Sequence, residues 1–309
     1  MNTAAMPVHR PAGPENGDRS VLNATQRQAG RRLLLPREHG AWGMVSLPFL
    51  AGAVVGGDWV TVRVLAALLA VFSVILLREP LLFYWRQRAA RNKYGCPSRP
   101  AAASGGYERR NALLSLLIYC LGGAIAGLYL AAQLPLVPLL LLGCGAALLT
   151  VVAAHFTVRN YQRHPVLQIA SAMGLTSSSL VAYLASSGRW EAPAFWIWGL
   201  FAAHSSVSVL IVHARLETMI AAKTSASAPT ADRRNAWIAQ AGIGLLLATL
   251  AISGRPWLVL PFLPPLLLHI WELRQFQPEK LHRLPMRRVG WMQLTASVAF
   301  CLLLIAVWR

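Results

Sequence analysis

The sequence predicts an all-α, polytopic membrane protein, a transmembrane helical bundle of about nine spans. Of its 309 residues, 56% are hydrophobic and only 13% are charged, and the hydrophobic residues gather in runs long enough to cross a bilayer. A soluble chain would need alternating polar faces to cover so much apolar surface. The charged residues lie between the runs, so membrane topology explains the net charge of +18 better than nucleic-acid binding does.

The apolar runs follow a polar tail. Residues 1–35 contain prolines, glycines and polar residues without the apolar segment of a signal peptide, and are expected to be disordered. Residues 36–309 are expected to form one transmembrane domain. The expected spans are 40–57, 61–78, 112–131, 135–156, 166–187, 194–214, 236–253, 256–272 and 289–308. The eighth contains four prolines between Pro256 and Pro265, so its helix must be kinked or broken.

The distribution of positive charge predicts the orientation. With the N-terminus inside, 25 of the 29 Lys and Arg residues fall on the inner side and four on the outer side. The positive-inside rule therefore predicts a protein of the bacterial cytoplasmic (inner) membrane with a cytoplasmic N-terminus. The outer connections are short, whereas two long basic inner loops are expected at 79–111 and 215–235. This asymmetry favours a function on the cytoplasmic side.

The most distinctive string is PREHGAWGMVSLPF, which begins at Pro36 and leads into the first span. An interfacial anchor accounts for Arg37, whose long side chain can reach the headgroups, and for Trp42, which suits the aromatic belt. It accounts less well for Glu38 and His39. These two residues leave a functional interpretation open beside the structural one.

This string resembles the start of the YwiC-like family of bacterial integral membrane proteins. The resemblance rests on HGAW from His39 to Trp42 and on Arg78, Glu79 and Pro80 at the end of the second span. It extends, through hydropathy and weak spacing, over about residues 33–308. The resemblance implies a membrane fold and a membrane location but no particular reaction.

A basic cluster follows the second span, in REPLLFYWRQRAARNKYG from Arg78. If this segment is helical, Glu79 and Arg86 share a face. Several guanidinium groups held together suit phosphate or pyrophosphate groups. The alternative is plain topology, because a cytoplasmic loop needs arginines for orientation alone. Arg78 fits that alternative least well, since it lies beside a proline at the very end of the span.

The sixth span carries an ionisable residue near its middle, His204. Such a group is costly in a membrane and by default faces the bundle interior or a wet cavity. His204, Ser208, Ile211 and Arg215 fall on one helical stripe, with Glu217 near its basic end. The alternative is a neutral histidine that a serine satisfies in a packed interface.

The end of the fourth span forms another stripe, in which His155, Arg159 and Arg163 are spaced by four. His155 and His204 are expected at different depths, which disfavours haem ligation by two facing imidazoles. The histidines also lack zinc-site spacing, and the four cysteines form no CxxC pair. The sequence therefore predicts no metal site and defines no cofactor.

The layout of spans also resembles UbiA-type prenyltransferases, which hold a prenyl diphosphate through Mg²⁺ and Asp-rich motifs. This chain has three aspartates and no such motif, so a shared scaffold would imply a lost or arginine-based chemistry. A degenerate enzyme of this kind, a small-molecule transporter and a non-catalytic assembly factor all remain as alternatives. The sequence does not predict an oligomeric state.

The leading hypothesis is a cytoplasm-facing basic pocket for an anionic or amphipathic small molecule, such as an anionic or prenyl-type lipid. Arg37, His39 and Arg78 would meet Glu79, His204 and Arg215 there. The candidate ligand-binding residues are Arg37, His39, Trp42, Arg78, Glu79, Arg86, His155, Arg159, His204, Arg215 and Glu217.

Overall fold

The computed structural model describes residues 33, 39–94, 104–159, 164–223, 230–274 and 286–308. The predicted disordered tail, except Leu33, lies outside this part of the chain, and so does Arg37. The helical elements are α2 (His39–Val55), α3 (Val62–Tyr94), α4 (Ser104–Gln133), α5 (Leu136–Val158), α6 (Pro165–Thr176), α7 (Ser178–Ser187), α8 (Ala192–Lys223), α9 (Thr230–Ile252), η1 (Pro256–Phe262), α10 (Leu263–Arg274) and α12 (Met286–Trp308).

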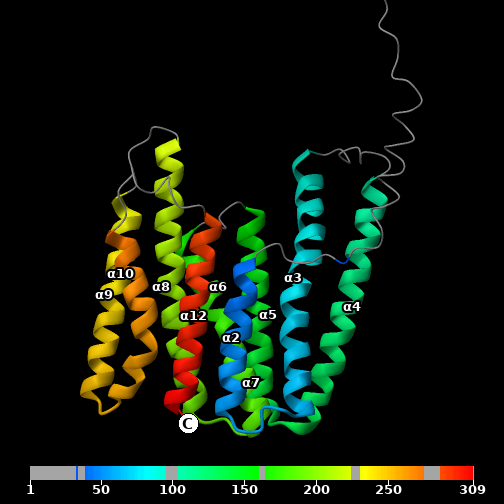
Figure 1. The fold of residues 1–309 in the computed structure, drawn as a ribbon. Coiled ribbons are helices and arrows are strands. Elements are labelled where there is room, and N and C mark those ends of the chain that lie inside the picture. Colours follow the sequence, from blue (N-terminus) through cyan, green and yellow to red (C-terminus); the bar gives the residue numbers. More distant parts are fainter. Residues whose placement is uncertain are drawn as a thin grey trace, which may run out of the picture.

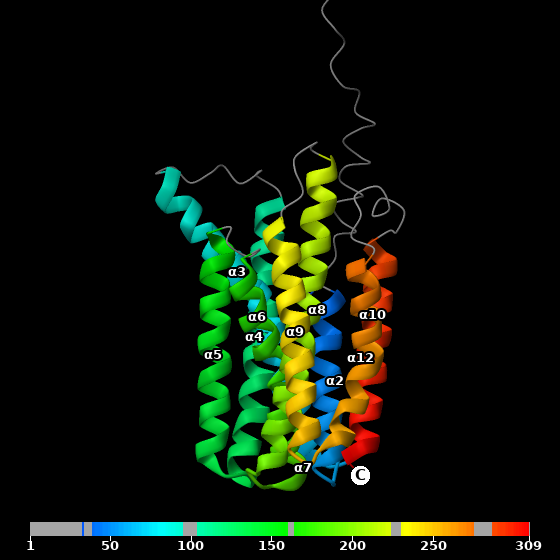
Figure 2. The ribbon, with the colours of Figure 1, turned by 90° about the vertical axis from the view of Figure 1, so that its left-hand side faces the viewer.

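These elements form an upright bundle of helical rods that run back and forth between two ends (Figures 1 and 2). Eight rods are long and apolar enough to cross a membrane, and α2 adds a shorter apolar helix at Ala41–Val55. Two of the eight are composite, because α6 with α7 and η1 with α10 each form one candidate span. The described residues contain no strand. The predicted all-α transmembrane class is confirmed.

The helices run further than the hydropathy predicted. The expected loop 79–111 is largely helical, because α3 continues to Tyr94 and α4 begins at Ser104. Likewise α8 continues to Lys223 and α9 begins at Thr230, so most of the expected loop 215–235 is helical. The prediction of two long loops was therefore wrong. Hydropathy shows where the apolar segment ends, whereas Arg, Ala and Gln are good helix formers and extend the helix beyond that point.

Two spans are interrupted within the bundle. The proline-rich run begins with the 3-10 segment η1, and the α-helix resumes only at Leu263, which confirms the predicted break. The span at 165–187 changes from α6 to α7 at Ser177. The hydroxyl of Ser177 donates to the Gly174 carbonyl at 2.6 Å, a local bond of the kind that competes with regular helix geometry.

Short turns close one end of the bundle and require glycine. Among the described residues, the three glycines with positive φ are Gly57 (φ 108°), Gly188 (φ 71°) and Gly254 (φ 77°). They follow α2, α7 and α9 in turn. Only glycine adopts this backbone without a steric penalty. These turns explain how the connections at this end can be so short.

Helix α2 lies inside the bundle and packs most closely on α7. A Cβ added to Gly52 would overlap the Ser179 carbonyl oxygen, and one added to Gly56 would overlap the Ser186 hydroxyl. The hydroxyl of Ser178 donates to the Val45 carbonyl at 2.8 Å. Small residues four apart allow two backbones to approach in this way. The serine run of the fifth span therefore packs against α2.

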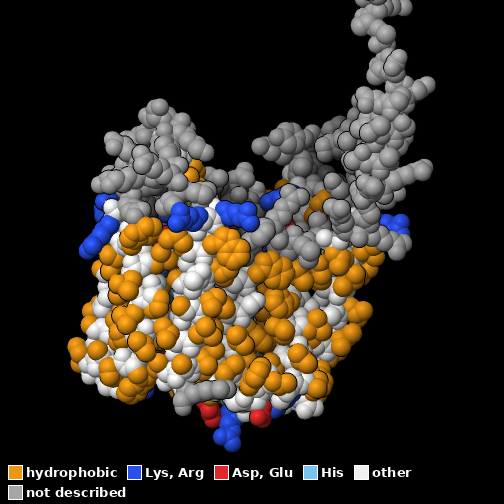
Figure 3. All heavy atoms as spheres, in the orientation of Figure 1, with side chains coloured by type: hydrophobic (Ala, Val, Ile, Leu, Met, Phe, Trp, Pro, Cys, Tyr) orange, Lys and Arg blue, Asp and Glu red, His pale blue; other side chains and the backbone are white. Residues whose placement is uncertain are grey.

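Apolar side chains cover the flanks of the bundle, and charge gathers at its ends (Figure 3). We call the end where α3 and α8 finish and α4 and α9 start the basic end. The described Lys and Arg side chains there include Arg86, Arg88, Arg109, Arg110, Arg159, Arg233, Arg234, Arg274, Arg287 and Arg288. At the opposite end the described Lys and Arg residues are Arg63, Arg189 and Arg255, beside the acids Asp58 and Glu191. Most of the described positive charge therefore lies at one end of the bundle.

Candidate functional site

One face of α8 presents polar side chains to the interior of the bundle. His204 is 3% exposed, and Ser208 and Arg215 are also buried. At 1.5 Å per residue, His204 lies about 18 Å along α8 from its start at Ala192 and Arg215 about 35 Å. Against a hydrocarbon core about 30 Å thick, His204 is near mid-membrane and Arg215 is near the basic end. The predicted stripe faces α10 and α12, as its contacts show.

Side-chain hydrogen bonds join the stripe to α10 and α12, as one separate bond at His204 and a connected series that starts at Ser208. His204 Nε2 lies 3.0 Å from Ser297 Oγ, and Ser208 Oγ lies 3.3 Å from His269 Nε2. The same nitrogen of His269 lies 3.3 Å from Gln293 Oε1. Because an amide oxygen only accepts, His269 must carry a proton on Nε2 to bond to it.

This series of hydrogen bonds ends at a buried ion pair between α8 and α10. Gln293 Nε2 donates to Glu272 Oε2 at 2.8 Å, and Glu272 Oε1 lies 3.7 Å from a terminal nitrogen of Arg215. The two side chains are only 6% and 1% exposed. We call His204, Ser208, Arg215 and their partners on α10 and α12 the buried polar chain. Those partners are His269, Glu272, Gln293 and Ser297.

The ion pair is incomplete. A nitrogen–oxygen distance of 3.7 Å is too long for a hydrogen bond, and within the described part of the chain Arg215 Nε and Glu272 Oε1 have no hydrogen-bond partner. Buried charges are expensive unless hydrogen bonds complete their pairing. The guanidinium of Arg215 therefore has capacity for a further acceptor.

A small cavity adjoins the buried polar chain near mid-membrane. It has a volume of about 10 Å³ and is lined by His204, His269 and Gln240 together with apolar side chains. The two polar atoms of the Gln240 amide are buried without a partner among the described residues. The volume is close to the smallest that accommodates one water molecule. The site therefore combines two imidazoles and an amide around a space of water size.

The rings of this region are stacked. The centroids of His204 and His269 are 6.2 Å apart, and His204 lies 4.6 Å from the ring of Phe300. Phe300 in turn contacts Phe201 and Phe262 edge-on. This apolar packing fixes the orientation of both imidazoles.

The other predicted site residues lie on α2, α3 and α5. Trp42 stacks obliquely on Phe72 at 5.5 Å, and His155 meets Trp85 edge-on at 6.0 Å. Glu79 is half-buried on α3, while Arg86 on α3 and Arg159 after α5 are exposed. The side chain of His39 lies outside the described residues. Arg78 is half-buried beside the buried Pro80.

The structure places His204 and Arg215 on one buried face of α8 but does not join them to the α3 group. Helix α3 packs on α4, α5 and α7, whereas α8 packs on α2, α6, α7, α9 and α10. Figure 1 shows α3 and α8 on different sides of α2. Glu217 is half-buried on α8 beyond Arg215 and is not part of the buried polar chain. The two groups share the basic end without sharing a described cavity.

Four residues of the buried polar chain, and Gln240 beside it, were not predicted from the sequence. His269 and Glu272 are three residues apart in an apolar span, which places them on one helical face, and that spacing is a usable signal. The prolines nearby predict the break in the helix but not these partners. Among the described residues, no group of three or more His, Cys, Asp and Glu side chains is placed to hold a metal ion.

Residues 35–183 match the model of the YwiC-like protein family. The chain is thus YwiC-like over this segment, which makes up just under half of its length. The match contains the HGAW string and Arg78, as the resemblance predicted, and it ends within α7. No curated protein and no solved structure matches the chain. The helices that carry the buried polar chain lie after the YwiC-like segment.

Proposed function

We propose that this YwiC-like membrane protein binds an anionic or amphipathic small molecule that enters from the basic end and contacts Arg215. The incomplete Arg215–Glu272 pair is the observation that carries the proposal. Guanidinium groups bind carboxylates and phosphates through two parallel hydrogen bonds. An ionisable pair kept inside a membrane bundle is by default a functional site.

In the same proposal, the arginines of α3 attract the ligand electrostatically. Arg86 and Arg88 are exposed at the basic end, and with Arg78 they add positive potential above the membrane interface. Such a field raises the local concentration of anions and speeds their association. These residues would then attract the ligand, and Arg215 would hold it.

The proposal includes the orientation, with the basic end in the cytoplasm. A cysteine at Val60, which is 76% exposed at the opposite end, should react with an impermeant maleimide in intact bacterial cells. A cysteine at Arg234, exposed at the basic end, should react only after permeabilisation. Both variants are made in a chain whose own cysteines are replaced by serine. Labelling of position 234 in intact cells would reverse the assignment.

The binding proposal is tested with Arg215→Met combined with Glu272→Gln, which removes the guanidinium and leaves no unpaired charge. Native mass spectra of the purified wild-type protein should show a retained anionic adduct that this double variant lacks. Arg234→Gln removes a positive charge from the same end at an exposed position and should keep the adduct. Equal adducts in all three proteins would exclude Arg215 as the binding residue.

A transporter is the second candidate, and two observations favour it. The spans at 165–187 and 256–274 are interrupted, as discontinuous helices are in many transporters. Hydrogen bonds also lead from Glu272 through Gln293 and His269 to Ser208, a series of buried polar groups of the kind that proton relays use. Uptake of the adduct identified above into proteoliposomes would separate this candidate from a binding protein that moves nothing.

A further inference from the structure

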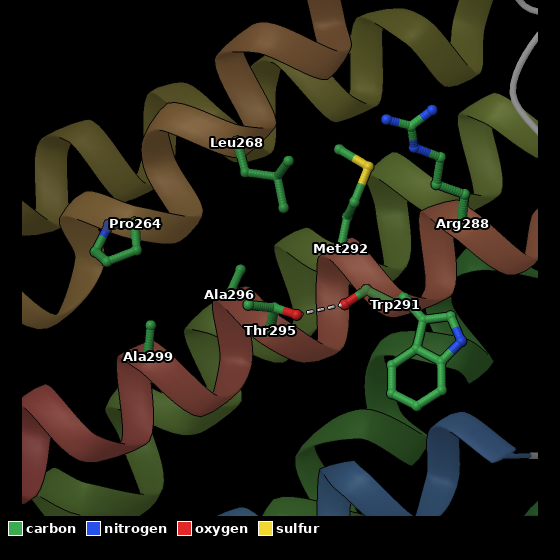
Figure 4. Close-up of a pocket in the computed structure, with 8 residues that line it drawn as sticks. All are labelled: Pro264, Leu268, Arg288, Trp291, Met292, Thr295, Ala296 and Ala299. Atoms are coloured by element: carbon green, nitrogen blue, oxygen red, sulfur yellow. Dashed lines mark hydrogen bonds between the residues drawn. The ribbon is translucent and has the colours of Figure 1, made fainter.

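An open groove runs down the outside of the bundle between α10 and α12 (Figure 4). Its volume is about 390 Å³. Pro264 and Leu268 of α10 form one wall, and Met292, Ala296 and Ala299 of α12 form the other. Arg288 lies at the end of the groove near the basic end, and its side chain extends from α12 on the same side as Met292 (Figure 4).

The lining is apolar except at that end. The one hydroxyl in the lining belongs to Thr295, and it donates to the Trp291 carbonyl at 2.9 Å, so its proton is already used. Arg288 is the one charged residue among those that line the groove, and its side chain is exposed. Trp291 lies one turn further along α12 and is 59% exposed, as suits the headgroup level of a membrane.

The length of the groove matches one leaflet. Arg288 and Ala299 are eleven residues apart on α12, which corresponds to about 16 Å of helix. The hydrocarbon core is about 30 Å thick, so one leaflet is about 15 Å. With Arg288 at the interface, Ala299 is near the middle of the bilayer. An acyl chain in the groove would therefore run from headgroup level to the midplane.

We propose that the groove binds one anionic phospholipid, with an acyl chain between α10 and α12 and the headgroup phosphate at Arg288. A guanidinium binds phosphate oxygens strongly, and Ala296 and Ala299 leave room for a chain against the helix. A second copy of this protein fits less well. In a two-fold contact through the groove, each Arg288 would approach the other, and like charges in contact disfavour that arrangement.

This lipid site is separate from the ligand site at Arg215 and goes beyond the proposed function. On α12, Met292 lines the groove and its neighbour Gln293 belongs to the buried polar chain. On α10, Leu268 lines the groove and its neighbour His269 belongs to the buried polar chain. The groove and the buried polar chain thus use different side chains of the same two helices. Failure of either proposal leaves the other intact, because no residue belongs to both.

The test compares phosphatidylglycerol with phosphatidylcholine on the intact protein in detergent, by native mass spectrometry at equal lipid concentration. The wild-type protein should bind the first phosphatidylglycerol about five-fold more tightly, as expected for one added basic contact near the interface. Arg288→Gln should remove this preference. Arg287→Gln is the matched control, because Arg287 is exposed beside it but does not line the groove.

Filling the groove tests the acyl-chain contact separately. Ala299→Phe should weaken binding of both lipids, whereas Val298→Phe, on the exposed flank next to it, should weaken neither. Unchanged melting temperatures identify the folded variants. Equal effects of Arg287→Gln and Arg288→Gln, or unchanged binding in Ala299→Phe, would overturn the proposal. A dimer that Ala299→Phe dissolves would assign the groove to a second copy instead.

Discussion

Replacing Arg215 alone with methionine should lower the free energy of unfolding by about 3–5 kcal/mol, because removal of one partner of a buried ion pair leaves an uncompensated charge. Glu272 is 2% exposed, and only the Gln293 amide would remain as its donor among the described residues. The measurement is denaturation of the purified protein in detergent, compared with Arg234→Met. Arg234 is exposed, so its replacement should change stability by less than about 0.5 kcal/mol.

Adding Glu272→Gln to Arg215→Met should restore most of the lost stability. The double variant carries no buried charge, and the new amide oxygen still accepts the hydrogen bond from Gln293 Nε2. Replacing a buried pair by neutral groups of similar size is often neutral or stabilising. If the double variant is as unstable as Arg215→Met, the arginine itself holds the three helices together. The pair would then be structural, and the argument for a ligand at Arg215 would fail.

Hydropathy and charge were sufficient to predict the membrane fold. Each of the nine predicted spans corresponds to one helical rod, and the run at 256–272 is broken as its prolines required. Helix ends were predicted less well. Residues 79–94 contain a proline, one acid and four basic residues and were therefore expected to form a loop, yet helix α3 continues through them. Hydropathy measures burial in lipid, and a helix does not need lipid to continue.

The sequence predicted the residues of the candidate site on α8 but not their partners on other helices. The spacing of His204, Ser208 and Arg215 identified one face of α8, since that signal is local to one helix. The partners on α10 and α12 come from distant spans, and a single sequence does not show which helices pack together. Convergence of His204 with Arg78 and Glu79 was the least reliable inference. It relied on a shared end of the bundle, and the described contacts do not join α3 to α8.

The family match and the two candidate sites fall in different halves of the polypeptide. The YwiC-like match runs from α2 into α7 and includes the HGAW string and most of the close α2–α7 packing. The buried polar chain and the lipid groove belong to α8, α10 and α12, beyond that match. Helix α2 also packs on α8 and α12, so it connects the two halves. A change that displaces α2 should therefore affect both.

Gly52→Ala should be among the most damaging single substitutions in the chain. Its Cβ would overlap the carbonyl oxygen of Ser179 and lie 2.9 Å from the Ser179 Cα. These are backbone atoms of a buried helix, so α2 and α7 would have to move apart. Overpacking of this kind costs about 1–3 kcal/mol and occasionally more, and here no rotamer change relieves it. The melting temperature of the purified protein should fall accordingly.

Gly56 and Gly199 provide the controls. A Cβ at Gly56 would overlap the Ser186 hydroxyl, which is a side-chain atom, so Ser186→Ala should partly rescue Gly56→Ala. No such rescue is available to Gly52→Ala, since every residue has a backbone carbonyl. Gly199 has no atom within 4 Å of an added Cβ, so Gly199→Ala should be neutral or slightly stabilising in its helix. A stable Gly52→Ala protein would mean that α2 and α7 are further apart than the structure shows, and the contacts of α2 with α8 and α12 would need to be reconsidered with them.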